Sequence, residues 1–131
     1  MTKNLLLKIE NISSGYGSTI IVNNFSFEIE KGQVLAITGS NGMGKTTLMK
    51  TIMGLIDVRN GKITFKNEDI TNSSPDYRSK LGIGYVPQGR EIFSALSVEQ
   101  NIMLPIYTRK KLSFNTKNKL EEIYSLFPIF G

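Results

Sequence analysis

Gly39-Ser40-Asn41-Gly42-Met43-Gly44-Lys45-Thr46 decides the fold of this chain, because it matches the pattern G-x-x-x-x-G-K-[ST] at every fixed position. Its glycines allow positive φ angles, so the backbone can bend round an anion without side-chain clashes. Successive backbone N–H groups are expected to converge on that anion, helped by the positive end of a following helix. The stretch therefore predicts a phosphate-binding loop, or P-loop.

Side chains at the end of the loop have predicted roles in binding a nucleotide. Lys45 is expected to reach the β- and γ-phosphates as a point charge, which also makes it a candidate catalytic group. The hydroxyl of Thr46 is expected to ligate Mg²⁺, and Thr47 to lie near the α-phosphate. The alternative, a glycine-rich turn that binds nothing, also fits the loop residues taken alone.

The sequence on either side of the loop supports the binding interpretation. Gln33–Thr38 (QVLAIT) is a compact apolar run, typical of a strand buried on both faces. Thr46–Ile56 has the length and the apolar spacing of a helix. A buried strand, a glycine-rich loop and a helix in succession are the structural context that a P-loop requires.

The rest of the chain predicts a sheet followed by helices. The expected strands are Leu5–Glu10, Ile20–Glu30, Lys62–Phe65 after an Asn60-Gly61 turn, and a second buried strand at Gly82–Pro87. The expected helices are Pro75–Leu81, one that a Ser97–Gln100 capping box opens and that ends before Pro105, and an amphipathic helix over about Thr116–Phe127. We therefore expect an α/β fold. A P-loop NTPase core with an antiparallel β flank would cover about residues 1–96, and a helical annex about residues 97–131.

Composition excludes several other classes of site. The 131 residues fit one domain, and 40% apolar with 21% charged residues is ordinary for a globular protein. The absence of cysteine and histidine excludes disulfides, thiolate chemistry, and histidine-dependent zinc sites or acid–base catalysis. A formal charge of +5 suits a polyanionic nucleotide or a solvated surface, and we expect no nucleic-acid partner. No apolar run reaches the length of a bilayer span, so we expect a cytoplasmic protein that contacts a membrane only through a partner.

Two further regions resemble functional parts of ATP-binding-cassette (ABC) ATPases. Tyr16 resembles the aromatic residue that stacks on adenine, and Val22 on the next expected strand is placed to pad the same base. Tyr85-Val-Pro-Gln88 resembles the Q-loop, which implies that Gln88 offers its carbonyl to Mg²⁺ or orients water in catalysis. Taken alone, Tyr16 also fits a half-buried turn aromatic, and Gln88 also fits plain loop surface.

A longer stretch is similar to one group of these ATPases. Gly82–Phe93 with Leu96–Ile102 is similar to the ATP-binding subunits of branched-chain amino-acid and urea importers, and Gln88–Phe93 (QGREIF) favours the urea branch. Ile123–Phe130 resembles the helical subdomain of the family just ahead of its signature motif. The resemblance implies a transport ATPase that uses ATP and Mg²⁺ at the inner face of the cell membrane. Its implied partners are transmembrane permease subunits and a second ATP-binding subunit, with which it would dimerise.

The resemblance covers only the N-terminal part of the family's pattern. Nothing in the sequence resembles the signature L-S-G-G-Q, the Walker B strand with its acidic pair, or the switch histidine. Asn67-Glu68-Asp69 is an acidic candidate, but it lies between the P-loop helix and the Q-loop, which is the wrong order. We therefore expect weak ATP binding and no hydrolysis by residues 1–131. The alternative function is a non-catalytic fragment that binds nucleotide or docks on a membrane subunit; a GTPase is disfavoured because N-K-x-D is absent.

Overall fold

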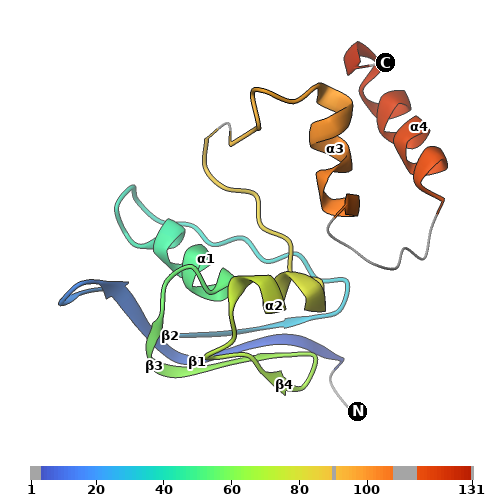
Figure 1. Cartoon of the computed structure of the whole chain (residues 1–131). Coiled ribbons are helices and arrows are strands. Elements are labelled where there is room, and N and C mark those ends of the chain that lie inside the picture. Colours follow the sequence, from blue (N-terminus) through green and yellow to red (C-terminus); the bar gives the residue numbers. More distant parts are fainter. Residues whose placement is uncertain (1–3, 90, 108–114, 131) are drawn as a thin grey trace. The chain divides into compact units, whose positions relative to one another are not determined.

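The computed structural model describes residues 4–89, 91–107 and 115–130 of the chain (Figure 1). The chain divides between Val86 and Pro87 into two units, which we describe one at a time. The first unit contains the sheet, the P-loop and two helices, and the second contains the remaining helices. Across these described stretches, no helix is long and apolar enough to cross a bilayer.

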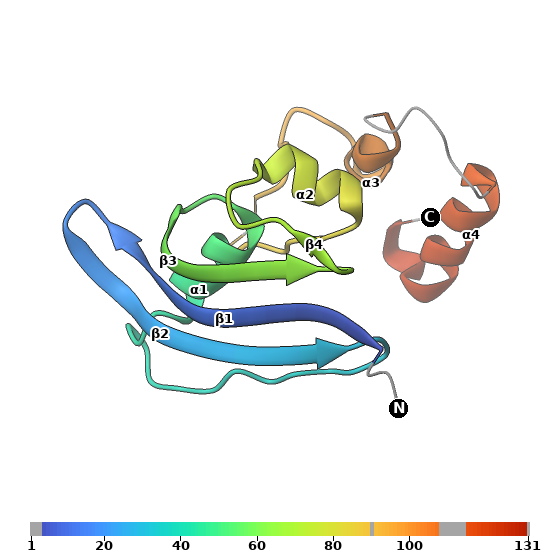
Figure 2. The same ribbon diagram turned by 90° about the horizontal axis from the view of Figure 1, so that it is seen from below.

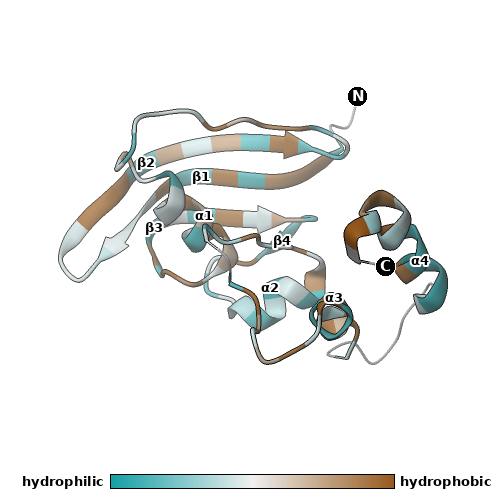
Figure 3. Ribbon diagram, turned by 90° about the horizontal axis from the view of Figure 1, so that it is seen from above, coloured by the Kyte–Doolittle hydropathy of each residue, from teal (hydrophilic) through white to brown (hydrophobic). Residues whose placement is uncertain are grey.

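The first unit is built on a four-stranded antiparallel sheet with the order β2-β1-β3-β4 (Figure 2). Its strands are β1 (Leu5–Tyr16), β2 (Thr19–Glu30), β3 (Val58–Phe65) and β4 (Glu68–Asp69). Hydrophobic and hydrophilic residues alternate over part of each long strand, at residues 7–10 of β1 and 25–30 of β2, and the two strands pair antiparallel (Figure 3). The expected antiparallel start is therefore confirmed, and β1 extends beyond the expected end at Glu10.

The predicted turn at Asn60-Gly61 is wrong, because β3 runs straight through these two residues. Gly61 has a φ of 92°, and the pairing of β1 with β3 shifts register between Glu10 and Ser13. The positive φ is thus used in a β-bulge and not in a turn. A Cβ atom at Gly61 would lie 2.3 Å from the carbonyl oxygen of Glu10 and 2.5 Å from that of Asn11. Only glycine fits this close approach of two strands.

Helix α1 (Lys45–Met53) follows the P-loop and lies with α2 (Pro75–Leu81) on the same side of the sheet (Figure 1). The core between the sheet and α1 is mainly aliphatic, and its buried members include Ile9, Ile12, Leu48, Ile52, Ile63 and Ile70. One buried polar contact joins the two layers: Thr51 Oγ1 donates to Ser14 Oγ at 2.7 Å. Both hydroxyl groups are fully buried, so this contact holds α1 in register against β1.

The two strands expected to be buried on both faces are not present as strands. Gln33–Thr38 and Gly82–Pro87 lie outside all four strands, and Val34 and Val86 are 95% and 93% exposed. A strand buried on both faces needs a hydrogen-bonded neighbour and a covering layer on each side. Among the described residues no strand pairs with either run. Apolar sequence alone therefore predicted these two strands wrongly.

The helical predictions agree with the structure except at two carboxyl ends. Helix α1 was expected to reach Ile56, but it ends at Met53, where Gly54 is the C-cap. Helix α2 has the expected bounds, with Ser74 as its N-cap. In the second unit, α3 (Val98–Tyr107) begins at the expected capping box, since Ser97 Oγ accepts from the Gln100 N–H at 3.1 Å and Gln100 Oε1 accepts from the Ser97 N–H at 2.9 Å. Its predicted end before Pro105 is wrong, because a proline in the last turn removes only one hydrogen bond. Helix α4 (Thr116–Leu126) confirms the amphipathic helix, and a 3-10 turn, η1 (Pro128–Phe130), follows it.

Candidate nucleotide-binding site

The P-loop backbone uses two of its three glycines as expected. Gly42 and Gly44 have φ angles of 83° and 90°, in the left-handed region that favours glycine. Gly39 does not have a positive φ, so that part of the prediction is wrong. A Cβ atom at Gly39 would meet only the Cβ of Met43, at 3.8 Å.

The amino end of α1 is open to an anion. Gly44 is its N-cap, and no side chain caps the helix there. The first backbone N–H groups of a helix have no acceptor within the helix, and they carry the positive end of its dipole. No acidic residue stands in the first turn to repel a phosphate. This end of α1 therefore offers free donors and positive potential at the position that the motif predicts.

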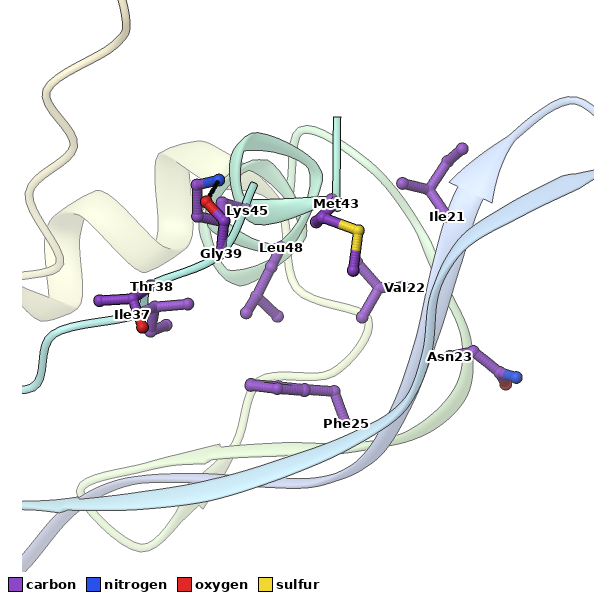
Figure 4. Close-up of a pocket in the computed structure, with 11 residues that line it drawn as sticks. Ile21, Val22, Asn23, Phe25, Ile37, Thr38, Gly39, Met43, Lys45 and Leu48 are labelled. Carbon is purple, nitrogen blue, oxygen red and sulfur yellow. Dashed lines mark hydrogen bonds between the residues drawn. The ribbon is translucent and has the colours of Figure 1, made fainter. Parts of the chain in front are cut away.

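Lys45 supplies the full charge at this position. Its Nζ donates to the carbonyl oxygen of Gly39 at 2.6 Å (Figure 4). It also donates to the carbonyl oxygen of Ser40 at 2.7 Å. The ammonium group thus lies against the loop that is predicted to hold phosphates. Both acceptors are uncharged carbonyls, which form weaker hydrogen bonds with an ammonium group than a phosphate oxygen does. A phosphate can therefore replace them favourably.

The two threonines after Lys45 differ in exposure. Thr46 is exposed on the first turn of α1, where its hydroxyl is available to a metal ion. Thr47 is buried, with 7% of its surface exposed, so its predicted approach to an α-phosphate stays a prediction. In the described part of the chain no cluster of three or more acidic side chains is able to hold a metal ion by itself. Mg²⁺ in such a site would be held by nucleotide phosphates and by water molecules, with few protein ligands.

Val22 and Tyr16 line different cavities. Val22 is buried in β2 and lines a cavity of about 390 Å³ beside the P-loop, together with Ile21, Phe25, Ile37, Met43 and Leu48 (Figure 4). Tyr16 is 52% exposed and lines another cavity, with Leu55, Asp57 and Arg59. Arg59 donates to the carbonyl oxygen of Gly17 at that cavity. The predicted joint contact of Tyr16 and Val22 with one adenine ring stays a prediction.

Gly44 also explains why the P-loop lies against β2. A Cβ atom at this glycine would lie 3.1 Å from Ile21 Cγ2, 3.2 Å from the Ile21 carbonyl oxygen and 3.5 Å from Val22 Cγ2. The glycine therefore permits both the left-handed backbone and the close packing on the strand.

Gln88 belongs to the second unit and is exposed. Its predicted role beside the metal and water stays a prediction. Arg90, part of the QGREIF stretch, lies outside the described residues.

Arg78 is the largest fully buried side chain among the described residues, and the sequence did not predict its burial. Its guanidinium group binds carbonyl oxygens at the carboxyl end of α1. An arginine in an ordinary helical pattern gives no sign of burial, because most arginines are exposed. The sequence did contain a sign of where α1 ends, namely Gly54. This residue was expected to lie inside the helix, but it is the C-cap, with a φ of 82°.

An open helix end, a glycine-rich loop and a lysine folded over that loop define a P-loop protein. Residues 22–131 match the family described as ABC transporter, and the chain belongs to this family.

Curated relatives agree with this assignment and differ in what they transport. The chain is 34% identical to a probable branched-chain amino acid transport ATP-binding protein, LivF, of Archaeoglobus fulgidus, over 94% of this chain and 51% of the relative. It is also 34% identical to the lipopolysaccharide export system ATP-binding protein LptB of Haemophilus influenzae, over 95% of this chain and 52% of the relative. The chain spans about half the length of these relatives. Equal identity to an amino-acid and a lipopolysaccharide system means that overall similarity does not select the cargo.

Solved structures show the same fold. A structure of an ATP binding subunit of an ABC transporter superposes with a TM-score of 0.81 at 22% identity, over 95% of this chain and 51% of that one. The cbiO1 protein of Clostridium perfringens, part of the ABC transporter complex cbiONQ, gives a TM-score of 0.75 at 27% identity, over 94% of this chain and 50% of that one. The chain therefore has about half of an ABC ATP-binding cassette.

Proposed function

We propose that this chain binds ATP together with Mg²⁺ on the P-loop and the amino end of α1. The observation that carries the proposal is the uncapped end of α1 with the Lys45 ammonium group beside it. Free N–H groups and one full positive charge are the donor set that a triphosphate requires. Bound Mg²⁺ neutralises phosphate charge, and the exposed Thr46 hydroxyl is its proposed protein ligand.

A titration of mant-ATP, a fluorescent ATP analogue, against residues 1–131 tests this proposal. Saturable binding that Mg²⁺ strengthens is expected. A linear, unsaturable signal in both conditions would contradict it.

The proposed role is that of the ATP-binding subunit of an ABC importer. It would pair with a second ATP-binding subunit and with permease subunits, through which it would reach the inner face of the cell membrane. We propose branched-chain amino acids or urea as cargo, with urea favoured by the Gln88–Phe93 stretch. Uptake of labelled leucine and of labelled urea, in cells with and without the gene, distinguishes the two. If cells with and without the gene take up leucine equally and urea equally, neither compound is the cargo.

Base selectivity is expected to be weak. Stacking on Tyr16 carries no hydrogen-bond code, so affinities for ATP and GTP should differ by no more than about 1–2 kcal/mol, the scale of one base–aromatic stack. Competition of unlabelled ATP and GTP against mant-ATP measures the difference. A strong preference for GTP would indicate base-specific contacts in the pocket and would overturn the stacking assignment.

Residues 1–131 are expected to bind ATP without hydrolysing it, which is the non-catalytic alternative. Hydrolysis needs a group that orients the attacking water. Asp69 is poorly suited to orient this water. Its carboxylate already accepts hydrogen bonds from the Thr71 hydroxyl, at 2.6 Å, and the Thr71 N–H, at 3.0 Å. These bonds and the charge of Lys62 lower the pKa of Asp69, so it is a weak base. Phosphate release is measured with and without Mg²⁺, with Lys45→Ala to reveal contaminating ATPases. Mg²⁺-dependent release that this variant lacks would show that a carboxylate of this chain, such as Glu91, orients the water.

A further inference from the structure

Arg78 is a buried cation at the junction of three segments. It stands on α2 with 2% of its surface exposed. Its Nη1 donates to the carbonyl oxygens of Thr51, at 2.9 Å, and Ile52, at 2.8 Å, in the last turn of α1. Its Nη2 donates to the Thr71 carbonyl oxygen at 2.9 Å, and its Nε to the carbonyl oxygen and hydroxyl of Ser73, at 3.2 Å and 3.1 Å.

All of these acceptors are uncharged, which makes the arrangement unusual. A buried charge without a counter-ion is costly, and burial lowers the pKa of Arg78 from its ordinary value. An arginine nevertheless keeps its proton inside a protein. The carboxyl end of a helix carries partial negative charge on carbonyl groups that lack partners in the helix. The guanidinium group and the end of α1 therefore satisfy one another.

Gly54 leaves room for the Arg78 guanidinium group at the end of α1, because glycine has no side chain. It is the C-cap of α1. A Cβ atom there would lie 3.0 Å from Arg78 Nε and 3.1 Å from Arg78 Cζ. Its own N–H bonds back to Lys50 and Thr51, so the left-handed cap and the guanidinium group together close the helix end.

The same guanidinium group connects α1 to the sheet. Thr71, whose carbonyl accepts from Arg78, also accepts on its hydroxyl from the Ile63 N–H of β3, at 3.0 Å. In the same turn of α1, the Thr51 hydroxyl bonds to Ser14 of β1. The helix has nine residues, so these two anchors hold its carboxyl half while its amino end carries the P-loop.

We propose that Arg78 is a positioning residue of the nucleotide site, which it serves without touching the nucleotide. It holds the carboxyl end of α1 and thereby sets the direction of the N–H groups and of Lys45 at the amino end. Phosphate binding depends on that direction, because hydrogen bonds weaken steeply when donors are misaligned. The inference rests on the proposed binding of ATP and adds a residue that the motif does not contain.

Two substitutions test the proposal by titration with mant-ATP and Mg²⁺. Arg78→Met removes the charge and all the hydrogen bonds, and is expected to weaken binding about tenfold, within the range for small misplacements at a site. Arg78→Lys keeps the charge but not the planar fork, and should recover part of that loss. Lys80→Met is the matched control, since Lys80 stands exposed on the same helix and pairs with Asp76.

Loss of stability alone is separated from positioning by a second control and a second measurement. Ile63→Val weakens the buried core at β3 without removing a hydrogen bond of α1, and its affinity should stay within about twofold of wild type. All titrations use conditions in which circular dichroism shows a folded protein. Hydrogen exchange of the α1 amides, without nucleotide, should be faster in both Arg78 variants than in either control.

The outcomes are distinguishable. Folded Arg78 variants that bind mant-ATP as tightly as wild type overturn the inference, and if Arg78→Met does not fold, Arg78→Lys decides by the same criterion. A wild-type chain that does not bind mant-ATP overturns the proposed function. In that case the exchange of the α1 amides still shows whether Arg78 holds the helix: unchanged exchange in the Arg78 variants overturns that role as well.

Discussion

Lys45→Ala is expected to abolish measurable binding of mant-ATP to residues 1–131. The substitution removes the full positive charge beside the open end of α1, and the hydrogen bonds to Gly39 and Ser40 that hold the loop in its present form. Loss of charge-assisted hydrogen bonds to two phosphates is expected to cost about 3 kcal/mol or more, which is a loss in affinity of more than about a hundredfold. Fluorescence titration in the presence of Mg²⁺ measures it.

Two variants control this experiment. Lys50→Ala removes a lysine from the last turn of the same helix, away from the loop, and should bind nearly as wild type does. Lys45→Arg should not restore full affinity, because a planar guanidinium group does not fit the place of a compact ammonium group. Equal affinities of wild type and Lys45→Ala would remove the basis for the P-loop assignment.

Gly61→Ala is expected to destabilise the first unit by about 3 kcal/mol or more. The new Cβ atom would carry the strain of a φ of 92° and would overlap the carbonyl oxygens of Glu10 and Asn11. Both neighbours are backbone atoms of β1, so no side-chain rotation relieves the contact. The midpoint of urea unfolding, followed by circular dichroism, measures the loss.

Gly32→Ala is the matched control for the bulge. Gly32 also has a positive φ, of 82°, but a Cβ atom there would meet no atom within 4 Å. The Gly32→Ala variant should therefore be destabilised only by backbone strain, by about 1–2 kcal/mol. If the two variants have the same unfolding midpoint, the close approach of β1 and β3 at Gly61 does not limit stability.

The predictable part of the fold is the part that local sequence controls. The second long strand follows from alternation, α2 from its early proline, and the start of α3 from the Ser97–Gln100 box. In each case the interactions that specify the element lie within a few residues of it. Gly42 and Gly44 belong to the same class, because the motif states where the loop must bend.

The failures concern elements whose conformation depends on distant partners. Gln33–Thr38 is apolar enough for a central strand, yet a strand exists only where a neighbour accepts its hydrogen bonds. Asn60-Gly61 has the residues of a turn, and the pairing with β1 decides that it forms a bulge.

By itself, the sequence determined the chemical identity of the site: a glycine-rich loop, one lysine and one threonine in an order that predicts phosphate binding. Tertiary structure alone decided what holds that site in place. The buried fork of Arg78 at the end of α1 joins residues far apart along the chain, and no local pattern encodes such a contact. The physical reason is that a motif specifies which groups meet the ligand, whereas burial and hydrogen-bond partners arise only once the layers have packed.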